Sequence, residues 1–214
     1  MIADVPSQRP LGDTERAGAA TPDRAGGRIV LLRHGSTEWA ARGRHTGRTD
    51  VALTAEGEAQ ARAAAGRLTG LGLHDPAVLC SPRRRSARTA ELAGLDARTW
   101  DALAEWDYGD YEGLTTPQIR ELVPHWTVWT HPCPGGEDAD AVESRADLVL
   151  SVAESHLPGR DVVLVGHGHF SRALITRWVG FPVLEGRRFA LSPGAVTVLG
   201  YERGVRQIVA HNAS

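Results

Sequence analysis

The chain contains no lysine, and all 24 of its basic residues are arginine. The absence of lysine excludes phosphate-binding loops that depend on a lysine, Schiff-base catalysis and attachment of pyridoxal phosphate. It also means that arginine holds any bound phosphate, and a guanidinium group can grip two phosphate oxygens at once. Mutational bias in a GC-rich genome explains the composition as a whole. We therefore use the lack of lysine only to exclude functions that require a lysine side chain.

Cysteine is scarce, and long apolar runs are missing. Cys80 and Cys133 are too few for a disulfide framework or a zinc knuckle, so we expect free thiols in a reducing, cytoplasmic compartment. No apolar run is long enough to span a bilayer, and residues 1–27 lack the apolar core of a secretory signal. The formal net charge of -2 provides no general attraction to nucleic acid or to anionic membranes.

The length and composition that remain are those of one globular domain. The chain has 214 residues, of which 42% are hydrophobic and 23% charged, and this length buries a sufficient core. Residues 1–27 are rich in Ala, Gly, Pro, Asp and Arg without apolar periodicity, which predicts a disordered N-terminal arm. Residues 28–214 contain no repeat and no linker, so we expect them to form a single domain.

Predicted strands and helices alternate along this domain. Short apolar runs indicate buried strands at residues 29–32, 77–80 and 162–166, with a further strand at 98–103. Helices are expected at residues 55–68, 81–93, 116–122, 137–156 and 168–179, the second of them capped by Ser81 with Pro82 at its first position. Alternation in the tail predicts edge strands at residues 188–191, 195–201 and 205–210. The pattern indicates a three-layer α/β/α sandwich with a mostly parallel central sheet.

Two of the buried strands end in the same way. The strand at 29–32 runs directly into Arg33-His34-Gly35, and the strand at 162–166 into His167-Gly168. A third strand ends at Ser81, ahead of a helix that carries Arg83, Arg84, Arg85 and Arg88. Because the carboxyl ends of parallel strands meet at one edge of a sheet, two histidines and at least two arginines converge there. Helix N-termini behind Ser81 and His167 add backbone donors, so these residues together describe a phosphate pocket.

Each residue also has a simpler interpretation. A single histidine is often a core residue, but a pair that ends two matching strands favours a functional site. Arg83, Arg84 and Arg88 are expected to be solvated charges on the helix surface. Cys80 and Cys133 have no assigned role in this pocket.

Five motifs along residues 29–180 are similar, in their order, to those of the histidine phosphatase superfamily, which contains cofactor-dependent phosphoglycerate mutases and many acid and sugar phosphatases. The motifs are Arg33-His34-Gly35, Gly47-x-x-Asp50-x-x-Leu53-Thr54-x-x-Gly57, Ser81-Pro82-x-x-Arg85-x-x-x-Thr89-Ala90, Leu103-x-Glu105 with Gly109 and Glu112-Gly113 after it, and His167-Gly168. The resemblance implies a phosphoglycerate mutase-like fold.

The resemblance also implies a role for each matching residue. His34 resembles the nucleophile that becomes phosphohistidine, and Arg33 and Arg85 resemble the arginines that hold the equatorial oxygens. His167 resembles the second histidine, which donates to the phosphoryl group. Glu105 resembles the general acid and base that protonates the leaving oxygen and then takes a proton from water. No metal or other cofactor is implied. The groups expected to bind phosphate are Arg33, Arg85, His167, Gly168, Thr46 and Gly47.

Three positions are less clearly assigned. Ala40 stands where the family commonly has asparagine after the tryptophan that matches Trp39, so Thr46 or Thr37 would have to supply the missing hydrogen bond. His169 completes a metal-like His-Gly-His spacing, but a packing or indirect role is favoured. Glu137 matches a place where the family often has Gly-Glu-Ser, although Asp138 replaces the serine here.

The family divides into mutases, which return the phosphate to a bound product, and phosphatases, which transfer it to water. Mutases of this type have a larger, basic insertion between the acid and the second histidine. The segment from Glu105 to His167 is modest here and its basic residues are few: Arg120, Arg145 and Arg160. Residues 103–113 and 165–172 resemble a subgroup of bacterial acid phosphatases, and fungal sugar bisphosphatases have a similar acidic aromatic loop.

We therefore expect a phosphomonoesterase that hydrolyses a small phosphorylated metabolite, a sugar phosphate in particular. The alternatives are a cofactor-dependent phosphoglycerate mutase, a metal-dependent hydrolase, and a phosphate- or phosphoprotein-binding module without catalysis. Neither nucleic acid nor a membrane is expected as a partner. An apolar edge strand near residues 196–199 would permit a homodimer.

Overall fold

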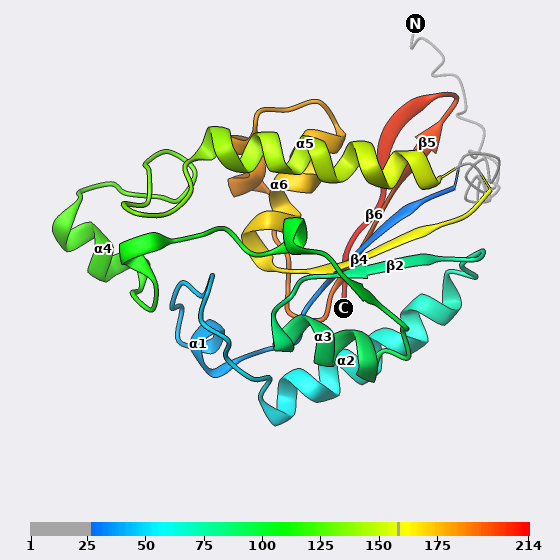
Figure 1. Cartoon of the computed structure of the whole chain (residues 1–214), viewed down its shortest axis with the longest axis horizontal. Coiled ribbons are helices and arrows are strands. Elements are labelled where there is room, and N and C mark those ends of the chain that lie inside the picture. Colours follow the sequence, from blue (N-terminus) through cyan, green and yellow to red (C-terminus); the bar gives the residue numbers. More distant parts are fainter. Residues whose placement is uncertain (1–26, 158) are drawn as a thin grey trace, which may run out of the picture.

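A computed structural model describes residues 27–157 and 159–214 of the chain (Figure 1). The predicted N-terminal arm lies, apart from Gly27, outside the described residues. Within them, one six-stranded sheet has the strand order β3-β2-β4-β1-β5-β6. The strands are β1 (Ile29–Arg33), β2 (Ala77–Cys80), β3 (Arg98–Thr99), β4 (Val162–Gly166), β5 (Val196–Glu202) and β6 (Val205–Ala213).

The first four strands in this order pair with one another in parallel, and β5 and β6 are added through antiparallel pairings. β2 pairs with β3 and β4, and β4 pairs with β1, always in parallel, whereas β5 runs antiparallel to both β1 and β6. The prediction of a mostly parallel sheet is therefore confirmed. The parallel register places Arg33 beside Gly166, so that the carboxyl ends of β1 and β4 lie side by side.

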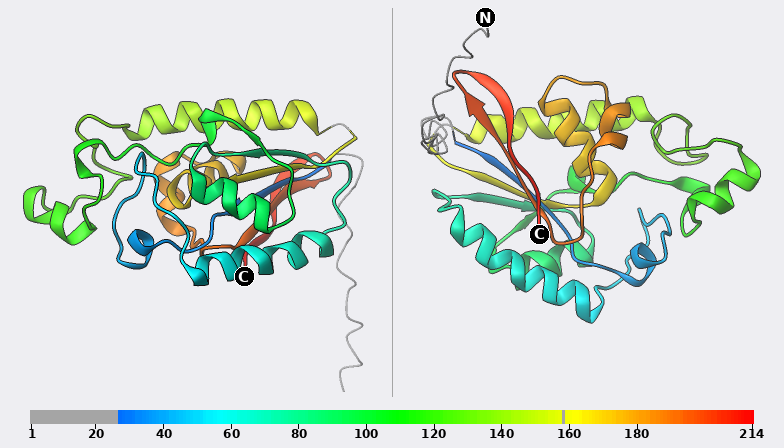
Figure 2. Two further views of the ribbon diagram at one scale, coloured as in Figure 1. Left: turned by 60° about the horizontal axis from the view of Figure 1, so that its bottom comes forward. Right: turned by 180° about the vertical axis from the view of Figure 1, so that it is seen from behind.

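Helices cover both faces of the sheet (Figures 1 and 2). One face packs against α2 (Ala55–Gly70) and α3 (Arg84–Leu92), and the other against α5 (Ala139–His156) and α6 (Gly168–Trp178). Alternate residues of a strand point to opposite faces. Val30 and Leu32 accordingly join the core under α2 and α3, while Ile29 and Leu31 join the core under α5 and α6. The three-layer α/β/α sandwich is thus confirmed.

Short elements lie beyond the carboxyl ends of the parallel strands. They are α1 (Glu38–Ala41), α4 (Thr116–Leu122) and the 3₁₀ turns η2 (Asp101–Leu103), η3 (Gly109–Tyr111) and η4 (Val183–Arg188). Thr115 caps α4 by accepting from the Gln118 N–H, and the Gln118 side chain accepts from the Thr115 N–H in return. These elements and their loops surround the end of the sheet where His34 and His167 lie.

Two predicted elements are shorter than expected. The helix predicted from Ser81 begins at Arg84, with Arg83 at the N-cap position. The Ser81 hydroxyl contacts the His167 ring and accepts from the Arg83 N–H at 3.3 Å, before the helix begins. The strand predicted over 98–103 ends at Thr99, and a 3₁₀ turn follows from Asp101. The chain leaves the sheet there after the Trp100 N–H donates to the Cys80 carbonyl at 2.8 Å.

The predictions for the tail are partly wrong. Residues 188–191 form no strand. Arg188 is the last residue of η4, and the Leu191 carbonyl accepts from the Arg33 side chain rather than from a neighbouring strand. Residues 196–199 form a strand, but β1 and β6 pair with it on both sides. It is therefore not an edge, and the suggested homodimer contact through it has no basis. The exposed edge on that side is β6.

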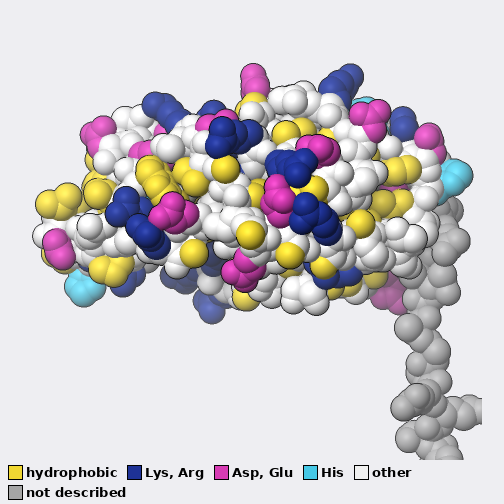
Figure 3. Space-filling view, turned by 90° about the horizontal axis from the view of Figure 1, so that it is seen from below, with side chains coloured by type: hydrophobic (Ala, Val, Ile, Leu, Met, Phe, Trp, Pro, Cys, Tyr) yellow, Lys and Arg dark blue, Asp and Glu magenta, His cyan; other side chains and the backbone are white. Residues whose placement is uncertain are grey.

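Basic and acidic side chains are interspersed on the face that Figure 3 shows. Many of them pair: Arg88 contacts Glu58 and Glu91, as expected for a solvated charge on a helix surface. Ion pairs this exposed contribute little to stability, because water and salt screen them. None of the described helices is long and apolar enough to cross a membrane.

The buried carboxylate of Asp161 offers a test of the fold. It accepts hydrogen bonds from the Arg28 N–H, Nε and Nη2 and from the His74 N–H, tying the start of β1 to the loops beside it. Asp161→Ala leaves these donors without a partner, so we expect a loss of about 3 kcal/mol in the free energy of unfolding, measured by urea denaturation. The control Glu91→Ala, at an exposed pair, should leave it nearly unchanged. Equal effects of the two variants would show that Asp161 does not anchor β1.

Candidate active site

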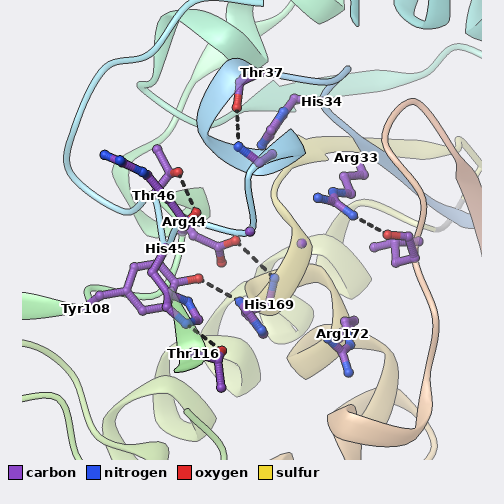
Figure 4. A pocket seen from close by; sticks show the side chains of 15 residues that line it. Arg33, His34, Thr37, Arg44, His45, Thr46, Tyr108, Thr116, His169 and Arg172 are labelled. Atoms are coloured by element: carbon purple, nitrogen blue, oxygen red, sulfur yellow. Dashed lines mark hydrogen bonds between the residues drawn. The ribbon is translucent and has the colours of Figure 1, made fainter. Parts of the chain in front are cut away.

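A cavity of about 300 Å³ opens at the carboxyl ends of β1 and β4 (Figure 4). Its wall comes from six segments: the end of β1, the α1 region, the loop around Glu105, the start of α4, the first half of α6 and the loop before β5. The lining residues are Arg33, His34, Thr37, Ala40, Gly43, Arg44, His45, Thr46, Glu105, Tyr108, Thr116, Gly168, His169, Arg172 and Leu191.

His34 follows β1 directly and is only 5% exposed. Its Nδ1 lies 2.7 Å from the Gly35 carbonyl oxygen. Because a carbonyl can only accept, Nδ1 carries the proton and Nε2 retains its lone pair. Burial, and then the charges of Arg85 and Arg33, hold the pKa of His34 well below its usual value. The imidazole is therefore neutral at neutral pH, with a free nucleophilic nitrogen.

His167 immediately precedes α6 and is fully buried. Arg85 Nε donates to His167 Nδ1 at 3.3 Å, which leaves the proton on Nε2, 2.6 Å from the Ser81 hydroxyl oxygen. The rings of His167 and His34 meet edge to face with their centroids 5.0 Å apart. Burial and then the charge of Arg85 hold the pKa of His167 well below its usual value as well.

The two predicted arginines are anchored by backbone carbonyls. Arg85 donates from Nη1 to Thr49 at 2.9 Å and from Nη2 to Thr46 at 2.9 Å. Arg33 donates from Nη1 to the Leu191 carbonyl, a bond drawn in Figure 4. Carbonyl oxygens orient a guanidinium group without neutralising its charge. Arg33 lines the cavity and remains available to an anion, whereas Arg85 is buried outside the lining.

Arg33 also has a buried nitrogen without a partner. Its Nε makes no hydrogen bond among the described residues. The guanidinium group lies against Gly168, where an added Cβ would stand 3.3 Å from Arg33 Cζ, tighter than ordinary contact. A buried N–H without an acceptor is unfavourable by about 1–3 kcal/mol. Its position in the cavity wall indicates a site for an anionic ligand.

Glu105 lies at the N-terminus of α6. Its Oε1 accepts from the N–H groups of Trp106 and Phe170 at 2.9 and 2.8 Å, and its Oε2 accepts from the His169 N–H at 3.0 Å. These donors fix the carboxylate in the wall. Among the described residues, Oε2 has only this one hydrogen-bond partner, and Glu105 lines the cavity.

The structure brings together most of the residues that the sequence predicts. Gly168 and Thr46 line the cavity, whereas Gly47, Arg85 and His167 do not. The Gly47 N–H donates to both carboxylate oxygens of Glu112 at 2.9 Å, and its carbonyl accepts from Arg85 at 3.2 Å. Gly47 therefore supports Arg85 from behind instead of facing the cavity. Ala40 lines the cavity and presents a methyl group there.

Other residues near the site have structural partners. Glu137 forms a two-pronged ion pair with Arg145 at 2.8 and 2.7 Å and does not line the cavity. His169 lines it, but its Nδ1 is 2.7 Å from the Tyr108 hydroxyl. In the part of the chain that is described, no group of three or more His, Cys, Asp or Glu side chains is arranged to hold a metal ion.

Four polar lining residues are not predicted from the sequence: Arg44, His45, Thr116 and Arg172. Arg172 donates from Nε to the Gly186 carbonyl at 2.8 Å, and its Cζ lies 4.9 Å from the centroid of the Trp129 ring. The signal for Arg172 was its spacing, because residues three apart share a helix face and His169 is three positions earlier. His45 had no such signal, since it belongs to an irregular loop.

The chain belongs to the histidine phosphatase superfamily, branch 1, whose sequence pattern matches residues 29–214. It is an enzyme of the phosphatase class, as its relatives indicate. An acid phosphatase of Mycobacterium tuberculosis is 56% identical over 182 residues, which cover 85% of this chain and 90% of that protein.

One solved structure and one more distant relative extend this picture. A structure from Mycobacterium tuberculosis has 53% identity and a TM-score of 0.86, covering 88% of this chain and 98% of the other. A 2,3-bisphosphoglycerate-dependent phosphoglycerate mutase of Brucella anthropi is 35% identical over 162 residues, covering 69% of this chain and 79% of the mutase. Family membership alone therefore does not distinguish hydrolysis from phosphoryl transfer to a product.

The buried histidines predict how stability depends on pH. The pKa values of His34, His167 and His169 lie well below the usual value, and that of His45 is about 4, all chiefly because of burial. Below about pH 6.5 the unfolded chain binds protons that the folded chain excludes, so the free energy of unfolding falls as the pH falls. On going from pH 7 to pH 5.5, each of these histidines should lower the free energy of unfolding by about 1 kcal/mol.

Urea denaturation across this pH range measures the effect. His45→Asn should reduce the pH dependence by about a quarter, because one of the four titrating groups is removed. His74→Asn, at an exposed position, should not alter it. An unfolding free energy that stays constant from pH 7 to 5.5 would show that these imidazoles are protonated in the folded protein.

Proposed function

We propose that the chain hydrolyses the phosphate monoester of a small metabolite through a phosphohistidine formed on His34. The observation that carries this proposal is the neutral His34 imidazole with its unprotonated Nε2, because His34 and Arg33 line the same cavity. Phosphoryl transfer is mainly a matter of positioning and of stabilising charge. The described side chains supply both.

In the first step, the lone pair on His34 Nε2 attacks phosphorus. A nitrogen–phosphorus bond forms, the ester oxygen–phosphorus bond breaks, and protonated Glu105 gives its proton to the departing oxygen. Arg33 and Arg85 stabilise the phosphoryl oxygens. His167, whose ring meets that of His34 edge to face, adds to the stabilisation of the same charge.

In the second step, water replaces the alcohol product. The Glu105 carboxylate takes a proton from this water, whose oxygen attacks phosphorus as the nitrogen–phosphorus bond breaks. Inorganic phosphate leaves and His34 returns to its neutral form. Glu105 is protonated again and ready for the next ester, so no metal is required by this sequence of steps.

The segment between Glu105 and His167 supports hydrolysis over mutase activity. The mutases that the sequence resembles have a larger, basic insertion in this segment. The three arginines between Glu105 and His167 are all engaged elsewhere: Arg120 with the Trp126 carbonyl, Arg145 with Glu137, and Arg160 with Asp75. None of them lines the cavity.

The remaining lining supports a sugar phosphate as substrate. Thr37 and Thr116 contribute hydroxyl groups, and Arg44 and Arg172 contribute cations. Hydroxyl and guanidinium groups suit a polyhydroxylated molecule with a polar or anionic group beyond its phosphate. This is the same substrate class that the sequence resemblance implies.

A screen of phosphorylated metabolites tests the proposal directly. We expect release of inorganic phosphate from sugar phosphates at rates well above any mutase activity on 3-phosphoglycerate, and undiminished rates in the presence of a chelator. Strong mutase activity with negligible hydrolysis of every monoester would overturn it. Loss of all hydrolysis on chelation would favour a metal-dependent mechanism instead.

The covalent intermediate is tested by trapping. Wild-type enzyme mixed with labelled substrate and denatured at once in alkali, in which phosphohistidine survives, should retain label. His34→Ala should retain none, and its kcat should fall by at least about 1,000-fold. His74→Ala, an exposed histidine remote from the cavity, serves as the matched control and should behave as wild type. Retained label in His34→Ala would exclude His34 as the nucleophile.

A further inference from the structure

The turn formed by residues 191–195 holds Arg33 from two directions. The Arg33 N–H donates to the Ala195 carbonyl at 3.1 Å, and the Gly194 N–H donates to the Arg33 carbonyl at 3.1 Å. The Leu191 carbonyl accepts from Arg33 Nη1. One turn therefore sets both the backbone of Arg33 and the orientation of its guanidinium group. A shift of this turn would carry the guanidinium with it.

The turn is itself well defined. The Ala195 N–H donates to the Ser192 carbonyl at 3.1 Å, with Pro193 and then Gly194 at the two central positions. Gly194 has φ +73°, and the order proline–glycine is the one that a type II turn requires. The hydrogen bond within the turn fixes its internal conformation, but a further contact is needed to fix its position relative to the sheet.

Asn212, near the end of β6, supplies that contact. Its Oδ1 accepts from the Ser192 N–H at 2.6 Å, and its Nδ2 donates to the Ser192 hydroxyl at 3.4 Å. The Asn212 N–H donates to the Thr197 hydroxyl at 3.2 Å. The side chain thus bridges the last strand of the sheet to the turn that grips Arg33.

A β-bulge gives Asn212 this direction. Val196 pairs with Ala213 and Val198 with Ala210, so β6 has one residue more than β5 between these pairs. Asn212 lies in the extra length with φ +53°, a left-handed conformation that asparagine tolerates better than most residues. Bulges bend a strand and redirect a side chain, and this one turns the amide of Asn212 towards Ser192.

We propose that Asn212 is a positioning residue for catalysis, which sets the Arg33 guanidinium through the turn at 191–195. With Nη1 held by the Leu191 carbonyl, the unpartnered Nε of Arg33 is left for the phosphoryl group. This inference rests on the proposed role of Arg33 in gripping phosphate. Asn212 itself does not line the cavity, so it acts only through the turn.

Binding of inorganic phosphate, measured by calorimetric titration, tests the inference on the full chain. Asn212→Gly retains the left-handed backbone but loses the amide, so phosphate affinity should fall about tenfold. Asn212→Asp keeps an acceptor for the Ser192 N–H and should stay close to wild type. Val209→Thr, at an exposed position on the same strand, is the control for general disturbance of β6.

A double-mutant cycle separates positioning from a merely structural role. Arg33→Ala should weaken phosphate binding strongly, and Asn212→Gly should add nothing in the Arg33→Ala background. The inference is overturned if Asn212→Gly alone binds phosphate as tightly as wild type. It is also overturned if Asn212→Gly causes the same loss with and without Arg33. Unchanged binding by Arg33→Ala would instead refute the proposed role of Arg33, and the inference with it.

Discussion

The parallel pairing of β1 with β4 is the interaction on which the rest of the site depends. It places Arg33 beside Gly166, and the His34 N–H continues the pattern by donating to the Gly166 carbonyl at 2.9 Å. Two histidines separated by 133 positions, 34 and 167, thereby meet with their rings 5.0 Å apart. The buried Val and Leu side chains of both strands hold this register, because a shift by one residue would turn each apolar set to the other face.

Burial of uncompensated positive charge gives the site its character. Arg85 and Arg33 are held by carbonyl oxygens, and the carboxylate of Glu105 is occupied by backbone N–H groups. Burial, reinforced by the charges of these cations, keeps His34 and His167 neutral. The same burial makes the free energy of unfolding fall in acid, because histidines of the unfolded chain bind protons and the buried imidazoles of the folded chain do not. The neutrality of His34 is thus coupled to a stability that declines as the pH falls.

The supporting contacts come from parts of the chain that are remote in sequence. Arg33 is oriented by a turn near residue 191, Arg85 by the loop around Thr46, and His167 by Ser81. Most of these partners are backbone atoms or single hydroxyl groups. They place the reacting groups without competing with a substrate for their charge, which is the property that phosphoryl transfer requires.

The sequence by itself determined the ends of the buried strands at 77–80 and 162–166, the family, and the residues that matched a motif, such as His34 and Arg85, because apolar runs and fixed spacings are local signals. It also predicted the layers of the sandwich, since alternation along a strand is local. Only the tertiary structure decided that Ser81 binds His167 instead of capping a helix, that residues 188–191 form no strand, and that Gly47 lies behind the cavity wall. It alone placed Arg172 in that wall and Asn212 against the turn. These contacts are hydrogen bonds between groups that are far apart in the sequence. The spacing of residues within one strand or helix does not specify such partners.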